Sequence, residues 1–221
     1  SNMKKLISIF VAISLLIFVI MFSGCSERMI KSYNHCNKIC HAMVEGNDEE
    51  FLRLVNNTKY NLNQYNVMPS LLPSIFESSE KTPLQKACYL ENPYYVEKLL
   101  ENGADPNYPN NFEGYEDFLP LRYAVWPSVT GGDAMARDAV KVVKTLLEYG
   151  ADPNVIAWRG RTCLIDIVAL NPKYYNEYHY EIVRLLVEYG TDISIKDQDG
   201  FTAYDYAVKY NRTELYDLLK P

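Results

Sequence analysis

The stretch that decides the fold is Gly103-Ala-Asp-Pro-Asn107, which recurs as Gly150-Ala-Asp-Pro-Asn154 and as Gly190-Thr-Asp-Ile-Ser194. A second recurring stretch of six residues is present four times, as Thr82-Pro-Leu-Gln-Lys-Ala87, Leu119-Pro-Leu-Arg-Tyr-Ala124, Thr162-Cys-Leu-Ile-Asp-Ile167 and Thr202-Ala-Tyr-Asp-Tyr-Ala207. Between the two stretches lie apolar residues at three- and four-residue spacing, as in Val96, Leu99 and Leu100. A unit of this size cannot bury its own apolar face, so the pattern predicts several stacked units.

The local chemistry of each unit predicts two helices. Thr82 is a good N-cap and Pro83 suits the first helical turn, so the six-residue stretch opens a helix. Ala87 and its counterparts keep that helix thin where neighbouring units stack. The apolar pairs form one face of a second helix, and Gly103 sits where the chain must leave that helix with a positive φ.

The two stretches together resemble the ankyrin repeat and its T-P-L-H-x-A opening. The resemblance implies an all-α fold, an ankyrin-repeat solenoid of about five helix pairs with inter-helix insertions. A degenerate first unit is expected from Asn37 to Asn63, followed by a long connection over 64–80. The openings lie farther apart than the family's roughly 33 residues, and we place the extra residues in 108–118 and near 126–138 and 170–180. No unit has the family's His, which is replaced by Gln85, Arg122, Ile165 and Asp205.

The N-terminal segment reads as an export signal. Ser1-Asn2 before Met3 resembles a remnant of an expression vector, and Lys4-Lys5 is followed by an apolar run over residues 6–22. Ser23-Gly24-Cys25 resembles the bacterial lipobox, with Phe22 where Leu is usual, and this implies a lipid on Cys25. The alternative is an uncleaved transmembrane anchor, for which seventeen residues is the short limit.

Three segments are therefore expected along the chain. They are a vector remnant plus lipoprotein signal peptide over 1–24, the lipidated Cys25 with a tether over 25–36, and the repeat domain over 37–221. This organisation implies a lipid-anchored protein on the periplasmic face of the cell envelope. By analogy with bacterial sorting signals, Ser26 after the cysteine favours the outer membrane over the inner one.

Composition excludes several classes of protein. The 221 residues carry 22 Lys and Arg against 28 Asp and Glu, a formal charge of −6, which argues against nucleic-acid binding and favours a basic partner. Five cysteines are too few for a disulfide scaffold. Tyrosine is abundant, with 19 residues, and its apolar ring and polar tip suit half-solvated contact surfaces.

The chain shows no pattern typical of catalysis. It has no nucleophile elbow, phosphate loop or zinc-protease motif, and His179 has no evident partner for general-base chemistry. In His35-Cys36-Asn-Lys-Ile-Cys40-His41 the ligand types fit zinc, but on a helix the two histidines point to opposite sides. We therefore expect buried structural thiols, no metal, no cofactor and no enzymatic activity.

The resemblance implies a contact surface for one folded protein partner. Ankyrin proteins usually bind partners at the turn tips and the inner face of the first helices, where this chain places aromatic and basic residues typical of binding hot spots. The residues expected there are Trp158, Arg159, Arg161, Trp126, Tyr115, Phe112, Tyr89, Phe201 and Tyr210. The alternative is that the long inserts fold back and bury these rings.

The expected function follows from the anchor and the surface together. A small lipid-anchored ankyrin array is similar to envelope proteins that act as immunity proteins, which inhibit a secreted toxic effector such as a phospholipase. The alternative is an envelope scaffold or stress-resistance lipoprotein without a dedicated toxin partner.

Overall fold

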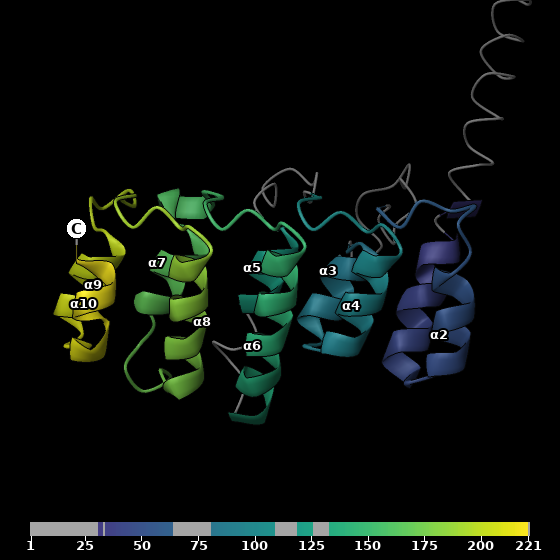
Figure 1. Cartoon of the computed structure of the whole chain (residues 1–221), viewed down its shortest axis with the longest axis horizontal. Coiled ribbons are helices and arrows are strands. Elements are labelled where there is room, and N and C mark those ends of the chain that lie inside the picture. Colours follow the sequence, from purple (N-terminus) through teal and green to yellow (C-terminus); the bar gives the residue numbers. More distant parts are fainter. Residues whose placement is uncertain (1–30, 33, 64–80, 109–118, 126–132, 221) are drawn as a thin grey trace, which may run out of the picture.

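The computed structural model describes residues 31–32, 34–63, 81–108, 119–125 and 133–220. Within these residues the chain forms helical hairpins that lie side by side in one row, with their connecting turns along one edge (Figure 1). The same residues form no strand, apart from a single isolated bridge between Ala157 and Arg161. The predicted all-α solenoid of five helix pairs is confirmed for this part of the chain.

Each unit contributes a first and a second helix. The bounds are 34–45 and α2 (Asp48–Val55) in the first unit, α3 (Pro83–Tyr89) and α4 (Pro93–Glu101) in the second, α5 (Pro120–Val125) and α6 (Asp133–Glu148) in the third, α7 (Cys163–Val168) and α8 (Glu177–Glu188) in the fourth, and α9 (Ala203–Lys209) and α10 (Tyr216–Leu219) in the fifth. The described residues also form two 3-10 turns, η2 (Trp158–Gly160) on a turn tip and η3 (Thr213–Leu215) before α10.

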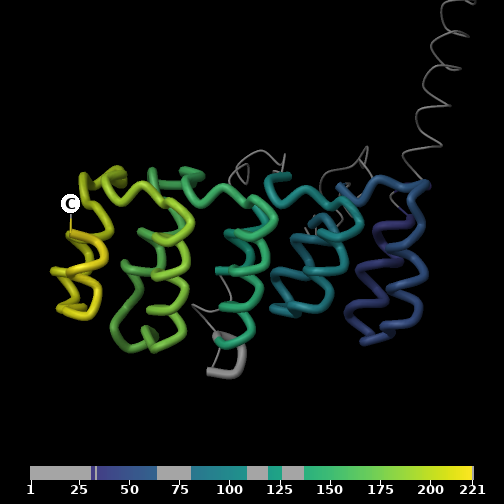
Figure 2. Tube along the Cα trace, in the orientation of Figure 1, coloured from purple at the N-terminus to yellow at the C-terminus, as the bar shows by residue number. Residues whose placement is uncertain are grey.

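The helices form two layers that run the length of the molecule. First helices stack on first helices, α3 on α5, α5 on α7 and α7 on α9, while α2, α4, α6 and α8 stack in the second layer. Figure 2 traces this order from the N-terminal units to the C-terminal ones. The turns between units therefore line up along the array, and their side chains share one edge.

Side-chain caps replace the missing family histidine at the start of the first helices. Thr82 and Gln85 form a capping box, in which the Thr82 N–H donates to Gln85 Oε1 at 3.0 Å and the Gln85 N–H donates to Thr82 Oγ1 at 3.2 Å. In the last unit Asp205 does the same, since its Oδ2 accepts from the Thr202 N–H at 2.8 Å. In these two units a side-chain acceptor at this position completes the cap, so the opening does not need His.

Glycines end the second helices as predicted. Gly103, Gly150 and Gly190 have φ of 88°, 85° and 88°. After each, the N–H of the next residue donates to a carbonyl five residues back, as Ala104 does to Leu99 at 3.0 Å. Only Gly adopts this conformation without strain, which explains why the motif recurs.

One continuous apolar core joins the layers. Leu99, Leu146 and Leu186 of the second helices are fully buried, as are Ala87 and Ala124 of the first helices. Each buried leucine stabilises the fold by about 1.5–3 kcal/mol relative to an exposed one. The small alanines let α3 and α5 approach closely, as the sequence predicted.

Three segments differ from the sequence-based expectation. The first helix includes residues 34–36, expected in the tether, because His35 and Cys36 are 6% and 0% exposed and belong to the packed array. The insert expected near 126–138 is helical from Asp133, so part of it lengthens α6, and the insert near 170–180 is helical from Glu177.

None of the helices in the described ranges is both long enough and apolar enough to cross a membrane.

Candidate partner-binding surface

A ladder of asparagine side chains fixes the turns to one another. Asn107 Oδ1 accepts from the Asp152 N–H at 2.8 Å, and its Nδ2 donates to the Gly150 carbonyl at 2.8 Å. Asn154 repeats both contacts one unit later, accepting from the Asp192 N–H at 2.7 Å and donating to the Gly190 carbonyl at 3.1 Å.

The ladder begins in the first unit and ends in the last Gly-Thr-Asp turn. Asn63 Oδ1 accepts from the Asp105 N–H at 2.7 Å, which explains why the degenerate first unit keeps Asn61-Leu-Asn63. Ser194 occupies the corresponding position in the last turn and bonds to Asp192 of its own turn instead. The repeated motif therefore both ends a helix and ties each turn to the next, so the edge that carries the tips is rigid.

The tip around Trp158 is braced against the following tip. The Ala157 N–H donates to the Arg161 carbonyl at 2.8 Å, and the Gln198 N–H donates to the Arg159 carbonyl at 2.9 Å. Arg159 has a φ of 63°, a conformation that non-glycine residues rarely adopt. Gly160 lies so close to the next tip that a Cβ there would meet the Gln198 nitrogen at 3.3 Å.

This braced tip presents Trp158 to solvent. The Trp158 side chain is 73% exposed, the largest exposure among the large apolar residues described. Arg159 lies beside it, with its guanidinium carbon 5.5 Å from the indole ring, and binds Asp199 at 2.6 Å. The predicted exposure of Trp158 is therefore found, and Arg159 is held in place next to it.

Arg161 lies in a hydrogen-bond network inside the array rather than on its exposed edge. Its Nε is 3.2 Å from Asp197 Oδ2, and its NH2 donates to the Tyr206 hydroxyl at 2.7 Å. Tyr206 in turn donates to Asp197 Oδ2 at 2.7 Å. The Arg161 side chain is only 21% exposed, so it mainly holds the two tips together and adds little contact surface.

The electrostatics of Asp197 match this structural role. Burial alone would raise its pKa, but hydrogen bonds from Tyr206, from the N–H groups of Phe201 and Asp199, and from Arg161 outweigh burial and hold the pKa below the usual value. The carboxylate therefore stays ionised and keeps the tip in one conformation.

The same network continues toward the middle of the array. Asp166 on α7 binds Arg122 on α5 at 2.7 Å and approaches Arg161 to 4.0 Å. Burial raises the pKa of Asp166, and the two guanidinium groups offset only part of that rise. This chain of charges links the third, fourth and fifth units beneath the tips.

An aromatic group adjoins the Trp158 tip. Phe201 is 39% exposed, and its ring lies 5.5 Å from that of Tyr206, which in turn lies 6.3 Å from Tyr210. The ammonium group of Lys209 lies 5.5 Å from the Phe201 ring. We call the exposed and half-buried residues of this group and of the tip, Trp158, Arg159, Phe201, Lys209 and Tyr210, the Trp158 surface; the buried Tyr206 supports it from below.

The remaining predicted contact residues are separate from the Trp158 surface. Tyr89 ends α3 and is 45% exposed, two units away from it. Phe112, Tyr115 and Trp126 lie outside the described residues, and so does the expected lipidation site, Cys25. The structure thus brings together Trp158, Arg159, Arg161, Phe201 and Tyr210 and leaves Tyr89 apart.

Residues with potential for chemistry serve the fold instead. Cys36, Cys40, Cys88 and Cys163 are free and buried, and burial raises the pKa of Cys40 and of Cys163 to about 12, so neither thiol is a nucleophile. His35 donates to the Leu54 carbonyl at 2.9 Å, whereas His41 is exposed beside Glu45.

The other histidine, His179, helps to cap α8, because its Nδ1 accepts from the Asn176 N–H at 3.2 Å. No cluster of His, Cys, Asp and Glu suited to a metal occurs among the described residues.

Comparison with family models gives one family for two parts of the chain. A model described as ankyrin repeats in three copies matches residues 133–220, and one described as an ankyrin repeat matches residues 79–111. The first unit, 34–63, falls outside both matches, although it forms the same helical hairpin and joins the same asparagine ladder.

Curated relatives agree with this result. An ankyrin repeat protein of Fowlpox virus (strain NVSL) is 27% identical over 204 residues, which cover 87% of this chain and 39% of that protein. An ankyrin repeat protein of Acanthamoeba polyphaga mimivirus is 25% identical over 169 residues, 67% of this chain and 21% of the relative. One from Rickettsia felis is 32% identical over 75 residues, 34% of this chain and 32% of the relative. The chain thus spans well under half the length of the relatives it matches.

Proposed function

The chain is an ankyrin-repeat protein over residues 79–111 and 133–220, and from this premise we propose that it is a protein-binding module that inhibits one partner. Stacked repeats present a long, rigid edge of turns and first helices, a form suited to gripping another folded protein. Binding by such an edge needs no reactive group, in keeping with the buried thiols and the capping role of His179.

The observation that carries the proposal is the exposure of Trp158 on a rigid tip. An indole that is 73% exposed costs free energy in water and contributes nothing to the core, whereas Trp and Arg dominate binding hot spots. The Arg159–Asp199 ion pair and the Gln198 hydrogen bond hold the tip before any partner arrives. A preorganised surface loses little conformational entropy on binding, which favours high affinity.

The proposed setting is the bacterial envelope. Lys4-Lys5, the apolar run over 6–22 and Ser23-Gly24-Cys25 support a lipid anchor on Cys25, on the periplasmic side and preferentially at the outer membrane. There the partner would be a toxic effector such as a phospholipase, and the anchor would hold the inhibitor next to the membrane that the effector attacks. Tethering raises the local concentration of inhibitor without any new contact.

The binding surface is tested by a substitution that leaves the fold intact. Trp158→Ala should weaken capture of the envelope partner by at least about 2 kcal/mol, because it removes a contact ring and little packing. The melting temperature should hardly change. Ile156→Ala, which also removes an exposed apolar side chain, serves as the control. A Trp158→Ala chain that binds its partner as tightly as the unchanged chain would place the surface elsewhere.

The inhibitory role is tested in cells. A deletion strain should be killed by sister cells that deliver the effector, and the intact gene should rescue it, whereas a Trp158→Ala copy should not. A Cys25→Ala copy should lose palmitate labelling and protect poorly. Normal competition by the deletion strain, with the effector shown to be delivered, would instead favour an envelope scaffold or stress-resistance role.

A further inference from the structure

A pocket with basic residues lies at the N-terminal end of the array, where the helix of residues 34–45 meets the end of α2. Its volume is about 330 Å³, at the lower end of the usual range for a ligand site. We call it the end pocket, and its lining includes Asn34, His35 and Lys38 from the first helix and Arg53, Asn57 and Tyr60 from α2 and the turn that follows. The His35 ring stacks on that of Tyr60, with 4.1 Å between the ring centroids, and forms a flat wall. No acidic residue of the described chain belongs to this lining.

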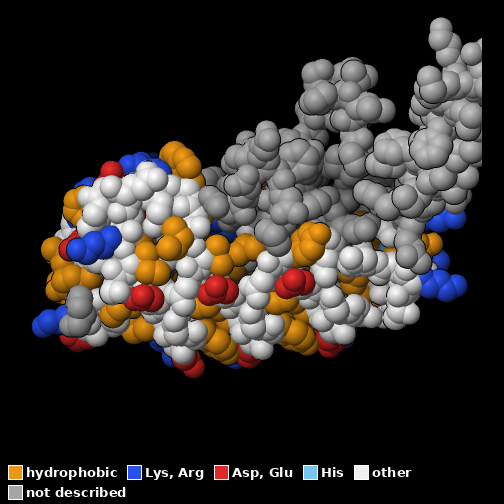
Figure 3. All heavy atoms as spheres, turned by 90° about the horizontal axis from the view of Figure 1, so that it is seen from above, with side chains coloured by type: hydrophobic (Ala, Val, Ile, Leu, Met, Phe, Trp, Pro, Cys, Tyr) orange, Lys and Arg blue, Asp and Glu red, His pale blue; other side chains and the backbone are white. Residues whose placement is uncertain are grey.

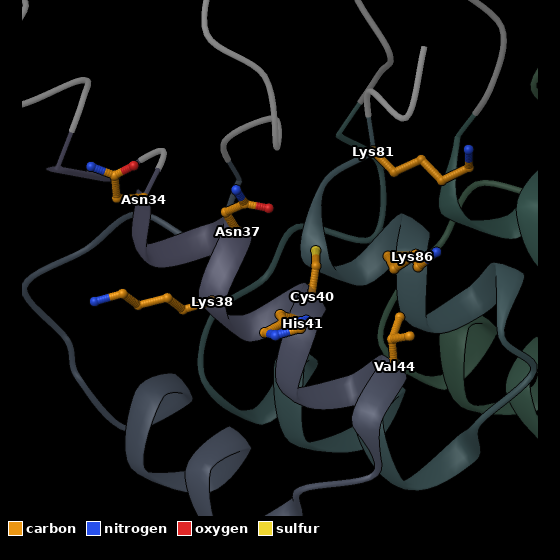
Figure 4. Close-up of a pocket in the computed structure, with 8 residues that line it drawn as sticks. All are labelled: Asn34, Asn37, Lys38, Cys40, His41, Val44, Lys81 and Lys86. Atoms are coloured by element: carbon orange, nitrogen blue, oxygen red, sulfur yellow. The ribbon is translucent and has the colours of Figure 1, made fainter. Parts of the chain in front are cut away.

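Cations from both helices of the first unit lie near the His35 ring. The Lys38 side chain extends from the first helix away from Lys86 of the next unit (Figure 4). Burial lowers the pKa of His35 more than the hydrogen bond to the Leu54 carbonyl raises it, and the charges of Lys38 and Arg53 lower it as well. The end pocket therefore has a positive potential next to His35.

Several hydrogen-bond donors of the end pocket remain available to a ligand. Glu50 accepts from Nε and NH2 of Arg53, at 2.6 Å each, which fixes the guanidinium group and leaves its third nitrogen without a hydrogen bond among the described residues. Lys38 forms no ion pair with any residue that the structure describes. Asn57 Oδ1 accepts from the Lys59 N–H at 3.4 Å, so the NH2 group of its amide remains a donor.

The charge at this end of the array differs from that of the whole chain, which has a formal charge of −6. Viewed from the side of the turns, acidic side chains recur along the array, whereas Lys and Arg side chains lie at its N-terminal end, on the right (Figure 3). The end pocket therefore attracts an anion, although the net charge of the protein would repel one.

The position of the end pocket along the chain points to a lipid as the source of this anion. Lys31, which also lines the pocket, follows Cys25 by only six residues. An extended chain spans at most about 3.6 Å per residue, so the backbone of Lys31 lies within about 22 Å of that of Cys25. A lipid on Cys25 would therefore hold the end pocket next to the headgroups of the membrane.

We propose that the end pocket binds the phosphate headgroup of an anionic phospholipid. A phosphate has oxygens on several sides, so it can accept from Lys38, from the third nitrogen of Arg53 and from the Asn57 amide together. Basic side chains beside a membrane anchor favour anionic lipids in the same way. The proposal rests on the proposed function, because the lipid on Cys25 supplies the nearby membrane.

Binding of a headgroup at this end would give the array one orientation. The end pocket lies in the first unit, whereas the Trp158 surface lies in the fourth and fifth units, at the opposite end of the row (Figure 1). With its N-terminal end against the headgroups, the array would project the Trp158 surface away from the membrane. A lipid on Cys25 alone would not fix this orientation.

The proposal is tested on the full chain in nonionic detergent, with isotope-labelled histidine. The chain has 3 histidines, so NMR follows the ring signals of His35, His41 and His179 separately. Dihexanoyl phosphatidylglycerol, a short-chain anionic lipid, should shift the His35 signals in a saturable way and leave those of His179, in the fourth unit, unchanged. Dihexanoyl phosphatidylcholine, which has no net charge, should need a concentration at least about fivefold higher. An equal response to the two lipids would overturn the proposal.

Inorganic phosphate separates the two sources of the same chemistry. It should shift the His35 signals only at a concentration well above that of the anionic lipid, because it is not concentrated at a surface. If it acts at the same concentration, the end pocket is a site for free phosphate, and the lipid proposal is wrong.

Matched variants locate the site. Lys38→Gln should weaken the response to the anionic lipid by about fivefold, because it removes one cation, and Lys38→Arg should restore the response. Lys86→Gln removes a lysine of α3 on the other side of the first helix and should leave the affinity within about twofold. An unchanged affinity in Lys38→Gln, or an equal loss in Lys86→Gln, would contradict the assignment of the pocket.

The two proposals fail in different ways. If the anionic lipid leaves His35 unchanged while Trp158→Ala still loses its partner, the pocket proposal is wrong and the proposed function stands. If Lys38 governs lipid binding but no envelope protein depends on Trp158, the pocket proposal stands and the proposed function is wrong.

Discussion

Glu91 has a backbone conformation and a buried position that are both unfavourable for a glutamate. It lies in the turn between α3 and α4 with a φ of 49°, and the corresponding residues of the first and last units are Gly46 and Asn211, with φ of 67° and 54°. All three turns share one hydrogen-bond pattern, in which the next N–H donates to a carbonyl five residues back. Gly and Asn tolerate this conformation, whereas Glu is strained in it.

The side chain of Glu91 adds an electrostatic cost. It is 4% exposed, and neither carboxylate oxygen has a hydrogen-bond partner among the residues that the structure describes. Burial, with a contribution from Asp138, raises its pKa to about 7. Because the folded protein holds this proton more tightly than the unfolded chain does, stability falls as the pH rises from the unfolded pKa, about 4.5, to the folded value.

Two substitutions of Glu91 separate these costs. Glu91→Gln should raise the free energy of unfolding by about 1–2 kcal/mol at pH 8 and by little at pH 5, because it removes only the charge. Glu91→Gly should also relieve the backbone and give up to about 1 kcal/mol more at both pH values. Denaturant unfolding at each pH measures the difference, with the exposed Glu97→Gln as control. An equal gain for Glu91→Gln at both pH values would contradict the assignment of the pKa.

At the scale of elements, the asparagine ladder connects the turns of successive units. Asn107→Ala removes two hydrogen bonds between the second and third units and leaves the exposed Asp152 N–H and Gly150 carbonyl to bond with water instead. We expect a loss of about 1–2 kcal/mol in the free energy of unfolding. Faster hydrogen exchange at the Asp152 N–H would locate the effect.

A local asparagine supplies the control for this prediction. Among the described contacts, the Asn171 side chain accepts only from the Lys173 N–H of its own turn, at 2.9 Å. Asn171→Ala should therefore cost less than Asn107→Ala and should leave exchange at Asp152 unchanged. Equal losses for the two variants would mean that the ladder adds nothing to ordinary turn hydrogen bonds.

The sequence predicted the elements better than their connections. Thr82, Pro83 and Gly103 are local signals, since each acts on the helix beside it, and the helix starts and ends follow from them. The ladder joins residues 36 to 45 positions apart, as Asn107 does to Asp152, and no local rule reveals such a contact. Its signal is nevertheless in the sequence, because Asn61-x-Asn63 copies the spacing of Asp105-x-Asn107.

The candidate surfaces were predictable to different degrees. Trp158 was found because an aromatic residue on a solvated turn is unusual in itself. Arg161 was expected on the same surface, but it forms an ion pair with Asp197 of the next unit. This ion pair holds the Arg161 side chain largely away from solvent.

At the scale of the whole molecule, the array behaves as a row of coupled units. Each unit touches only its neighbours, so the total stability is the sum of unit and interface contributions. A central unit has an interface on both sides, whereas the last unit has one. The same substitution should therefore have different consequences at the centre and at the end.

Leu146 and Leu219 make this comparison possible, because both are fully buried leucines, one in central α6 and one in terminal α10. Leu146→Ala should cost about 2–5 kcal/mol and lower the midpoint of the whole helical signal, since α6 packs on α4, α5 and α8. Leu219→Ala should let the last unit fray first, with faster hydrogen exchange in α9 and α10 and a smaller shift of the main transition, because α10 contacts α9 and η3. Circular dichroism during denaturation gives the midpoints, and hydrogen exchange gives the location. Equal shifts of the main transition for both variants would show that the array unfolds as one unit, with no weaker end.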